Sequence, residues 1–395
     1  MRATPDGGRA GEGGLMGGEG ERRRGFGREQ LGKLHDVEVE EMPRIQVTRK
    51  HAIAFGVFVA SALAFLYFVL PKLTGLRTTW DKLDQGDPIW LVVAAVLELC
   101  SFAGYMMLFR AVFVRGDSRI DWRESYQITM AGVAATRLFA AAGSGGVALT
   151  AWALRRSGME RRVVACRMVA FMVLLYAVYM GALVIDGAAL RTGILHGGGG
   201  FAITLIPAIF AAVSIGATLA ISLLPQDVER RLERWAQGGR RGAKVVAKVL
   251  TAPALAGSGV RTAIGMIRDR ELGTLGAVAW WGFDVATLWA AFHAFGTAPP
   301  VGVIVMAYFV GMLANVLPIP GGIGGVDGGM IGALIAFGVD SGLAVVAVLV
   351  YRGFAFWLPT LPGAVAYFQL RRTVHRWQDE RVGDEPAELA KPVPA

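Results

Sequence analysis

Charged residues are scarce in this sequence and unevenly placed. Only 18% of its 395 residues are Asp, Glu, Lys or Arg. The stretch 272–370 carries four of them, Asp284, Asp327, Asp340 and Arg352. A segment of that length with so little charge cannot form the water-facing surface of a globular domain. Because 54% of the residues are hydrophobic and a further 53 residues are glycine, the composition excludes a soluble enzyme and predicts a polytopic membrane protein.

Several residue types that build other kinds of site are also rare. The two cysteines, Cys100 and Cys166, both lie in apolar runs, which argues against a disulfide framework. Asn315 is the single asparagine and is followed by Val-Leu, so the sequence has no glycosylation sequon. The five histidines are scattered, and no Walker, His-Glu-x-x-His or Cys-x-x-Cys motif occurs. We therefore expect no catalytic residue, no metal and no cofactor.

Apolar runs dominate the chain between its two ends. Six of them are long enough to cross a bilayer, for which about 20 residues suffice: 52–70, 88–109, 163–185, 201–224, 272–295 and 342–367. Two further apolar regions, 125–157 and 301–339, are interrupted. The helix-breaking residues are Gly143, Gly145 and Gly146 in the first region and Pro320, Gly321, Gly322 and Gly324 in the second. Each region predicts two short helices that meet at an unwound turn or form a re-entrant pair, in an all-α membrane protein.

The remaining segments are polar. Residues 1–50 are rich in glycine and charge and predict a disordered tail without the apolar core of a signal peptide. We place a transmembrane domain at 51–370 and a second tail at 371–395. Within the basic loop 225–271, apolar residues at 228, 232 and 235 recur with helical spacing, and a second apolar stripe begins at 245. This loop predicts short helices on the membrane surface, the alternative being a mobile basic loop.

Basic residues set the orientation. They cluster before the first span, after the second, after the first interrupted pair, in the 225–271 loop and after the last span. The net charge of +9 is therefore explained by the positive-inside rule, and we expect no nucleic-acid partner. All these segments lie on one side if each interrupted pair returns to its own side, which predicts two cytoplasmic termini. Lys72, Arg77 and Lys82, in the first outside loop, are discordant.

This orientation gives the two halves of the domain the same order of elements in opposite directions. The halves are about 51–186 and 201–370. In each half, a glycine-rich break precedes a helix that carries a single arginine, Arg167 in the first and Arg352 in the second. Paired interruptions in two inverted halves indicate the midplane site of a transporter. The sequence therefore predicts an inverted repeat with its site at the breaks.

Ionisable residues inside apolar runs are the best candidates for function. Each costs roughly 2.5–3.5 kcal/mol at the bilayer centre, so those present usually face a cavity or a partner. The candidates are Glu98, Arg137, Arg167, Asp284, Asp327 and Arg352. The alternatives for each are an interhelical ion pair or a side chain that reaches the interface. For Asp327, which follows a break, helix capping is an equal alternative to a transport role.

Two motifs resemble a known family. The sequence from Pro320 to Asp327, Pro-Gly-Gly-Ile-Gly-Gly-Val-Asp, resembles the Pro-Gly-Gly-x-Gly-x-x-Glu signature of the lysylphosphatidylglycerol synthase transmembrane (flippase-like) family. Tyr351-Arg352-Gly353 looks like the family's Tyr-Arg helix, and the Gly143–Gly146 region resembles its first-half motif. The resemblance spans about 50–372. It departs from the family in having Asp327 where glutamate is usual and in lacking the soluble aminoacyltransferase domain, so we expect no aminoacylated lipid to be made by the chain itself.

The resemblance implies a lipid flippase or transporter-like protein in the bacterial cell membrane. We expect it to bind or translocate an anionic phospholipid or a lipid-linked headgroup. The expected substrate-binding residues are Arg352, Arg167, Arg137, Asp327, Tyr351 and Asn315. The expected partners are anionic membrane lipids and, in addition, a separate lipid-modifying enzyme. Two alternatives remain open: a membrane partner or transferase of polyprenyl-phosphate glycolipid metabolism, and a small-anion transporter.

Overall fold

The computed structural model describes residues 86–116, 118–138, 144–223, 241–316, 322 and 324–389, all within one compact unit, Gln46–Ala395. The N-terminal tail, the first apolar run at 52–70 and the segment 228–235 lie outside these residues. The described helices are α5 (Pro88–Phe113), α6 (Trp122–Leu138), α7 (Ser144–Arg156), α8 (Arg161–Thr192), α9 (Phe201–Ser222), α11 (Arg241–Arg268), α12 (Leu275–Phe295), α13 (Val301–Leu313), α14 (Gly325–Ala336), α15 (Ser341–Arg352) and α16 (Leu358–Leu389).

The described part of the chain is helical throughout. Two 3₁₀ turns, Leu272–Thr274 and Ala314–Val316, and one π-helical turn, Gly353–Trp357, complete the elements, and these residues contain no strand. Five helical segments are long and apolar enough to cross a membrane: Pro88–Phe113, Arg161–Thr192, Phe201–Ser222, Leu272–Phe295 and Ser341–Glu380. They coincide with five of the six apolar runs expected from the sequence. The prediction of an all-α polytopic membrane protein is confirmed.

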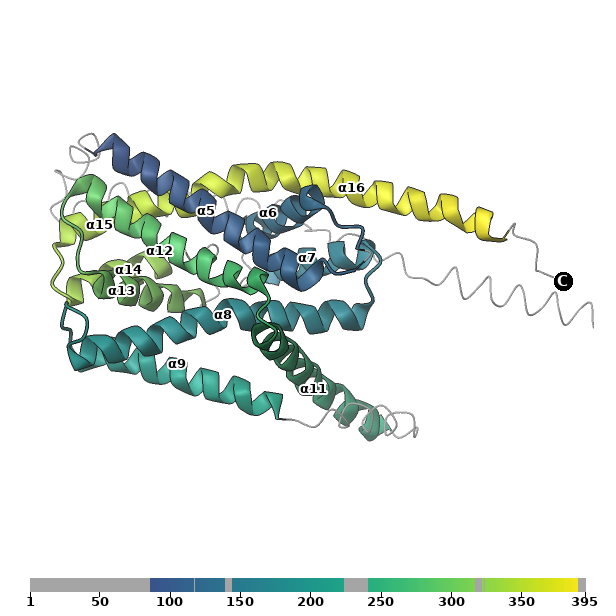
Figure 1. The fold of residues 1–395 in the computed structure, drawn as a ribbon, viewed down its shortest axis with the longest axis horizontal. Coiled ribbons are helices and arrows are strands. Elements are labelled where there is room, and N and C mark those ends of the chain that lie inside the picture. The colour runs from purple at the N-terminus through teal and green to yellow at the C-terminus, as the bar shows by residue number, and fades with distance from the viewer. Residues whose placement is uncertain are drawn as a thin grey trace, which may run out of the picture. The chain divides into compact units, whose positions relative to one another are not determined.

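Both interrupted regions form pairs of short helices. α6 ends at Leu138 and α7 begins at Ser144, while α13 ends at Leu313 and α14 begins at Gly325. The two helices of each pair pack against each other. Figure 1 shows α13 and α14 beside the end of the bundle where α5 begins, and α6 and α7 beside the end where α5 finishes. The two helical hairpins therefore enter the bundle from opposite ends.

The end of the bundle where α5 finishes is rich in arginine, and we call it the basic end. It includes Arg115, Arg119, Arg156, Arg161 and Arg268. Arg115 forms an ion pair of 2.5 Å with Glu271, which ties the end of α5 to the turn before α12. At the opposite end, the backbone N–H of Asp87 donates to the carbonyl of Ala294, 2.9 Å away. These contacts fix α5 and α12 as an antiparallel pair.

Glycine allows α5 and α12 to approach closely. A Cβ atom on Gly104 of α5 would lie 2.7 Å from the Cβ of Ala279 and 2.9 Å from the backbone nitrogen of Trp280 in α12. The hairpin α13–α14 is packed in the same way, because a Cβ on Gly311 would lie 2.8 Å from the backbone nitrogen of Met330. Van der Waals packing at small residues is the main way in which helices associate in a membrane. Gly104 and Gly311 therefore have a packing role.

Two segments differ from the sequence-based expectation. Residues 241–268, expected to be part of a loop with short surface helices, form the single 28-residue helix α11, which packs on α8 and α9. Arg261 donates from Nη1 to the carbonyl of Ser222 at 3.0 Å, and Val260 and Met266 are buried. The expectation failed because small residues such as Gly259 let the later part of this helix pack closely on α8.

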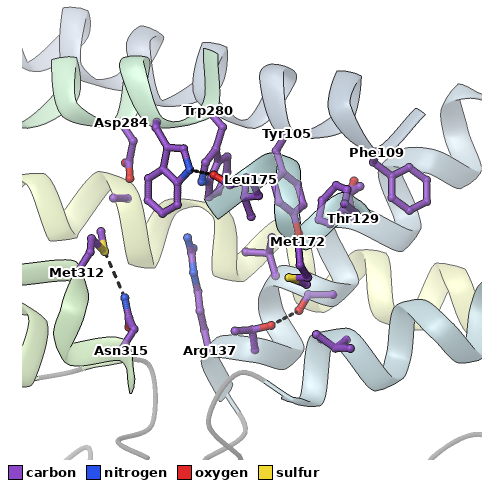
Figure 2. Close-up of a pocket in the computed structure, with 18 of the residues that line it drawn as sticks. Tyr105, Phe109, Thr129, Arg137, Met172, Leu175, Trp280, Asp284, Met312 and Asn315 are labelled. Atoms are coloured by element: carbon purple, nitrogen blue, oxygen red, sulfur yellow. Dashed lines mark hydrogen bonds between the residues drawn. The ribbon is translucent and has the colours of Figure 1, made fainter. Parts of the chain in front are cut away.

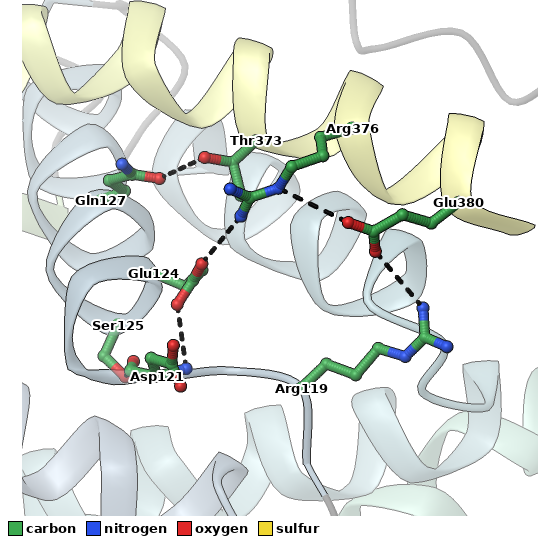
Figure 3. A network of polar contacts seen from close by, with 8 residues as sticks. All are labelled: Arg119, Asp121, Glu124, Ser125, Gln127, Thr373, Arg376 and Glu380. Carbon is green, nitrogen blue, oxygen red and sulfur yellow. Dashed lines mark hydrogen bonds and ion pairs between the residues drawn. The ribbon is translucent and has the colours of Figure 1, made fainter.

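The expected tail at 371–395 also differs, because α16 continues to Leu389 without a break at 371. Its extension packs against α6. Thr373 donates to Gln127 at 2.8 Å, and both side chains are buried, as is Trp377 (Figure 3). Around this bond lies a more exposed network in which Arg376 contacts Glu124 at 3.2 Å. The first part of the expected tail is therefore a folded part of the domain.

Replacing Gly104 with leucine should lower the stability of the bundle by about 1–3 kcal/mol, the usual cost of overpacking. Thermal unfolding in detergent measures the change as a lower midpoint. Gly181→Leu is the matched control, because a Cβ at this helical position in α8 meets no heavy atom within 4 Å. Equal midpoints for the two variants would contradict the close approach of α5 and α12.

Replacing Thr373 with valine should cost about 1–3 kcal/mol, because it leaves the buried amide oxygen of Gln127 without a donor. Arg376→Gln should cost less than about 1 kcal/mol, since that side chain is 54% exposed and its ion pairs are screened. Both values come from thermal or denaturant unfolding of the purified protein. A larger loss in the Arg376 variant would show that the exposed network, rather than the buried bond, holds α16 on α6.

Candidate functional site

One pocket lies in the middle of the bundle, where the two helical hairpins meet the long helices. Its volume is about 470 Å³. Its lining includes six polar side chains from five different elements: Glu98, Arg137, Asp284, Asn315, Tyr351 and Arg352. The apolar and aromatic lining includes Phe109, Phe113, Met168, Phe171 and Met172. The pocket is therefore amphipathic, with a charged part beside the ends of the two hairpins and an apolar part that extends toward the basic end.

Arg137 is placed by the last turn of α6, immediately before the first break. Figure 2 shows its side chain reaching from the end of α6 into the pocket, on the side where Asp284 and Trp280 lie. Its Nη1 donates to the carbonyl of Phe356 at 2.9 Å. The aromatic ring of Phe356 lies 5.5 Å from the Arg137 guanidinium carbon and 5.1 Å from that of Arg352. Because both distances suit a cation–π contact, one ring helps to hold two arginines at the same pocket.

Arg352 ends α15 and forms an ion pair with Asp327. The distance from its Nε to Asp327 Oδ1 is 2.5 Å, and both side chains are largely buried, at 14% and 10% exposure. The other carboxylate oxygen, Oδ2, accepts a hydrogen bond of 2.9 Å from the backbone N–H of Gly324. Gly324 has φ +83°, a conformation that favours glycine, and it precedes the first residue of α14. Asp327 therefore both caps α14 and orients Arg352.

Two carboxyl groups lie side by side at the inner wall of the pocket. Glu98 of α5 and Asp284 of α12 are 1% and 5% exposed, and their side chains are within hydrogen-bonding contact. Tyr308 and Tyr351 both donate their hydroxyl groups to Asp284 Oδ2, the latter at 3.1 Å. Asp284 Oδ1 and Glu98 Oε2 are buried and accept no hydrogen bond from the described residues. Each of the two neighbouring carboxyl groups therefore has one buried oxygen without a donor.

The structure brings together most of the residues that the sequence indicated. Arg137, Arg352, Tyr351 and Asn315 line the pocket, and Asp327 lies behind Arg352. Asn315 donates to the sulfur of Met312 at 3.2 Å. Arg167 does not line the pocket: its Nη1 donates to the carbonyl of Phe113, 3.1 Å away. This bond is an interhelical contact, but it joins the guanidinium to a backbone carbonyl and is not the interhelical ion pair considered above.

The glycines of the breaks are placed as follows. Gly146, in the first turn of α7, lines the pocket, and a Cβ on it would collide with the backbone of Gly132 in α6. Gly145 belongs to the same turn. Gly322 also lines the pocket and has φ +65°. Gly143, Pro320 and Gly321 lie outside the described residues.

Sequence reasoning singled out Glu98 and Asp284 as intramembrane carboxyl groups but did not include them in the expected site. It missed Tyr308 altogether. Their positions in the sequence could have marked them as site residues, because both carboxyl groups lie near the middle of a long apolar run, where a charge is most costly. A tyrosine in an apolar helix carries no comparable signal, because only the fold shows that its hydroxyl meets Asp284. Among the described residues, no group of three or more His, Cys, Asp or Glu side chains is arranged to hold a metal ion.

The ion pair between Asp327 and Arg352 can be tested with a double-mutant cycle. Asp327→Asn should cost on the order of 3 kcal/mol, because it leaves a buried guanidinium without its counter-charge. Arg352→Gln should cost a similar amount. The double variant should lose less stability than the two single variants lose together. The measurement is the unfolding free energy in detergent, and simple additivity would show that the two side chains are not coupled.

Comparison with known proteins agrees with the sequence motifs. The family model described as "Lysylphosphatidylglycerol synthase TM region" matches residues 53–363. A UPF0104 membrane protein of Methanothermobacter thermautotrophicus is 30% identical over 164 residues, which are 40% of this chain and 46% of that protein. Another match to a UPF0104 membrane protein of this organism is 23% identical over 307 residues, 73% of this chain and 88% of the relative. The chain belongs to the family of the lysylphosphatidylglycerol synthase transmembrane region.

Proposed function

We propose that this protein binds the anionic headgroup of a membrane lipid in the central pocket and carries it across the bilayer. The observation that carries the proposal is the amphipathic lining of a single pocket, in which Arg137 and Arg352 face the same space as a run of aromatic and methionine side chains. A phosphate-containing headgroup suits the arginines, because guanidinium groups donate charge-assisted hydrogen bonds to its oxygens. The apolar part suits the glycerol backbone and the first carbons of the acyl chains.

The position of the pocket supports transport as well as binding. The charged part lies where α6 and α7, entering from one end, approach α13 and α14, entering from the other (Figure 1). Interrupted helices from opposite ends that meet at one site are typical of transporters built from inverted repeats. We therefore propose that the two halves, 51–186 and 201–370, are such a repeat, and that rocking of one half against the other exposes the pocket alternately.

The size of the pocket is consistent with a headgroup rather than a whole lipid. At about 470 Å³ it lies in the range of small-molecule sites, about 300–1,000 Å³. A phospholipid with two full acyl chains is larger, so its chains would remain in the surrounding bilayer. The proposal assigns no catalytic residue to the chain, and a separate enzyme would modify the lipid.

The arginines at the basic end support an orientation in the bacterial cell membrane. Short basic segments remain in the cytoplasm, so we propose that the basic end is cytoplasmic and that both termini lie there. Arg115 and Arg119, at 41% and 49% side-chain exposure, are available to attract anionic lipids of that leaflet. The apolar part of the pocket extends toward this end, which supports loading from the cytoplasmic leaflet.

Lipid translocation in proteoliposomes tests the proposal. The purified chain should accelerate the movement of a fluorescent phosphatidylglycerol between leaflets, and Arg137→Gln should reduce the rate at least about tenfold. The expected loss follows from about 1.5–3 kcal/mol for a hydrogen bond to a charged group. Arg352→Gln should have a similar effect, once the fraction of folded protein is matched.

Arg167→Gln is the matched control, because this arginine also lies in an apolar helix but does not line the pocket; its guanidinium donates to the backbone carbonyl of Phe113. Its translocation rate should stay within about twofold of the wild-type rate, since its removal deletes no headgroup donor. Unchanged rates in both pocket variants would overturn the headgroup assignment. Transport of inorganic phosphate in place of the lipid would favour a small-anion transporter.

A further inference from the structure

The carboxyl pair Glu98 and Asp284 is not explained by the binding of an anion. A negatively charged headgroup would enter a pocket that is lined by these two carboxyl groups and two arginines, one of which is already paired with Asp327 behind it. With all three carboxyl groups ionised, negative charge exceeds positive charge, and each anion bound increases the excess. Buried charges interact strongly because water screens them poorly. The pair must therefore change its charge if an anion is to bind well.

Hydrogen bonding at the pair points to the same conclusion. Asp284 Oδ2 is supplied with donors by Tyr308 and Tyr351, whereas Asp284 Oδ1 and Glu98 Oε2 have none. Two ionised carboxylates in contact hold only acceptors between them. A single proton placed between the two groups would make one of them a donor and satisfy the contact. Buried polar atoms are nearly always satisfied, so the geometry is that of a pair ready to accept one proton.

The surroundings favour a proton over a metal cation. The titratable and charged groups that interact with the pair are Arg137 on α6, Tyr308 on α13 and Tyr351 on α15. Tyr105 on α5, Tyr176 on α8 and Arg352 on α15 line the same pocket. The arginines are donors only, and the two tyrosine hydroxyls that reach Asp284 point their protons at it. A sodium or calcium ion needs several oxygen ligands, and arginine repels it.

We propose that Glu98 and Asp284 form a proton-carrying pair that takes up one proton when an anionic headgroup binds and releases it when the headgroup leaves. The inference rests on the proposed function for the identity of the anion. The release step is a simple ionisation. The protonated carboxyl group of the pair loses its proton to water on the side to which the pocket is open, and both groups are then carboxylates. Headgroup and proton therefore cross together, and a proton gradient supplies the energy.

Because binding of the proton and binding of the headgroup are thermodynamically linked, each must raise the affinity for the other. If one proton binds with each headgroup, the affinity for the headgroup must rise about tenfold for each unit by which the pH falls, over the range in which the pair titrates. In a weakly buffered solution, binding of dihexanoyl-phosphatidylglycerol, a water-soluble probe, should remove about one proton per lipid from the solvent. Isothermal titration calorimetry in buffers of different ionisation enthalpy measures this number.

Glu98→Gln and Asp284→Asn keep the shape of the pair but remove the shared proton. Each variant should bind the probe with an affinity that does not change with pH and with no proton uptake. Glu271→Gln is the control, because this carboxylate pairs with Arg115 at the basic end, outside the pocket, and should behave as the wild type. Two variants are used so that a folding defect in one does not decide the result.

A measurement without lipid separates failure of the pair from failure of the proposed function. Infrared spectra of the unliganded wild type, recorded as the pH is lowered, should show the appearance of the C=O stretch of one protonated carboxyl group, which is missing in both pair variants and remains in Glu271→Gln. If this band is present and the lipid does not bind, the pair holds and the proposed function fails. If the lipid binds without proton uptake, or only when sodium replaces choline in the buffer, the proton-carrying pair is wrong.

Discussion

Charge buried in the middle of an apolar bundle determines how this protein is built. The stretch 272–370 carries only four charged side chains. Two of them, Asp284 and Arg352, line the central pocket, and a third, Asp327, lies directly behind Arg352. Each must be partnered, because an isolated charge at this depth is costly. The partners come from four other helices, so the site also ties the helices together. The same contacts that hold the bundle therefore define the functional centre.

The buried charges are bonded by irregular backbone segments as well as by side chains. Gly324 donates to Asp327 from a conformation that favours glycine, and the π-helical turn presents the carbonyl of Phe356 to Arg137. π-helical turns are rare and occur frequently at functional sites. Irregular backbone is tolerated at membrane depth where it is buried in protein or lines a cavity. The helix breaks are thus part of the electrostatics of the pocket, not only hinges between helices.

The sequence predicted the membrane class, five described spans and the two interrupted pairs, because apolar length and glycine or proline breaks act locally. It also indicated Arg137 and Arg352, whose cost in an apolar run is visible without a fold. It could not predict that Arg167, with the same local character, bonds the carbonyl of Phe113 in α5 and does not itself line the pocket. It could not place Tyr308 beside Asp284, since that contact joins two helices whose packing depends on the whole bundle. The length of α11 and the docking of α16 were missed for the same reason.

The π-helical turn at Gly353–Trp357 has a consequence for the evolution of the chain. It joins α15, which carries Arg352, to α16, which carries Thr373 and Trp377 against α6. A π-helical turn holds one residue more than an α-helical turn, so rewinding the same residues into a regular α-helix would rotate everything beyond them by about 100°. Thr373 and Trp377 would then leave α6, although both lie far from the turn. We therefore expect the π-helical turn and the spacing from Arg352 to Thr373 to be kept together in relatives whose neighbouring sequences have diverged.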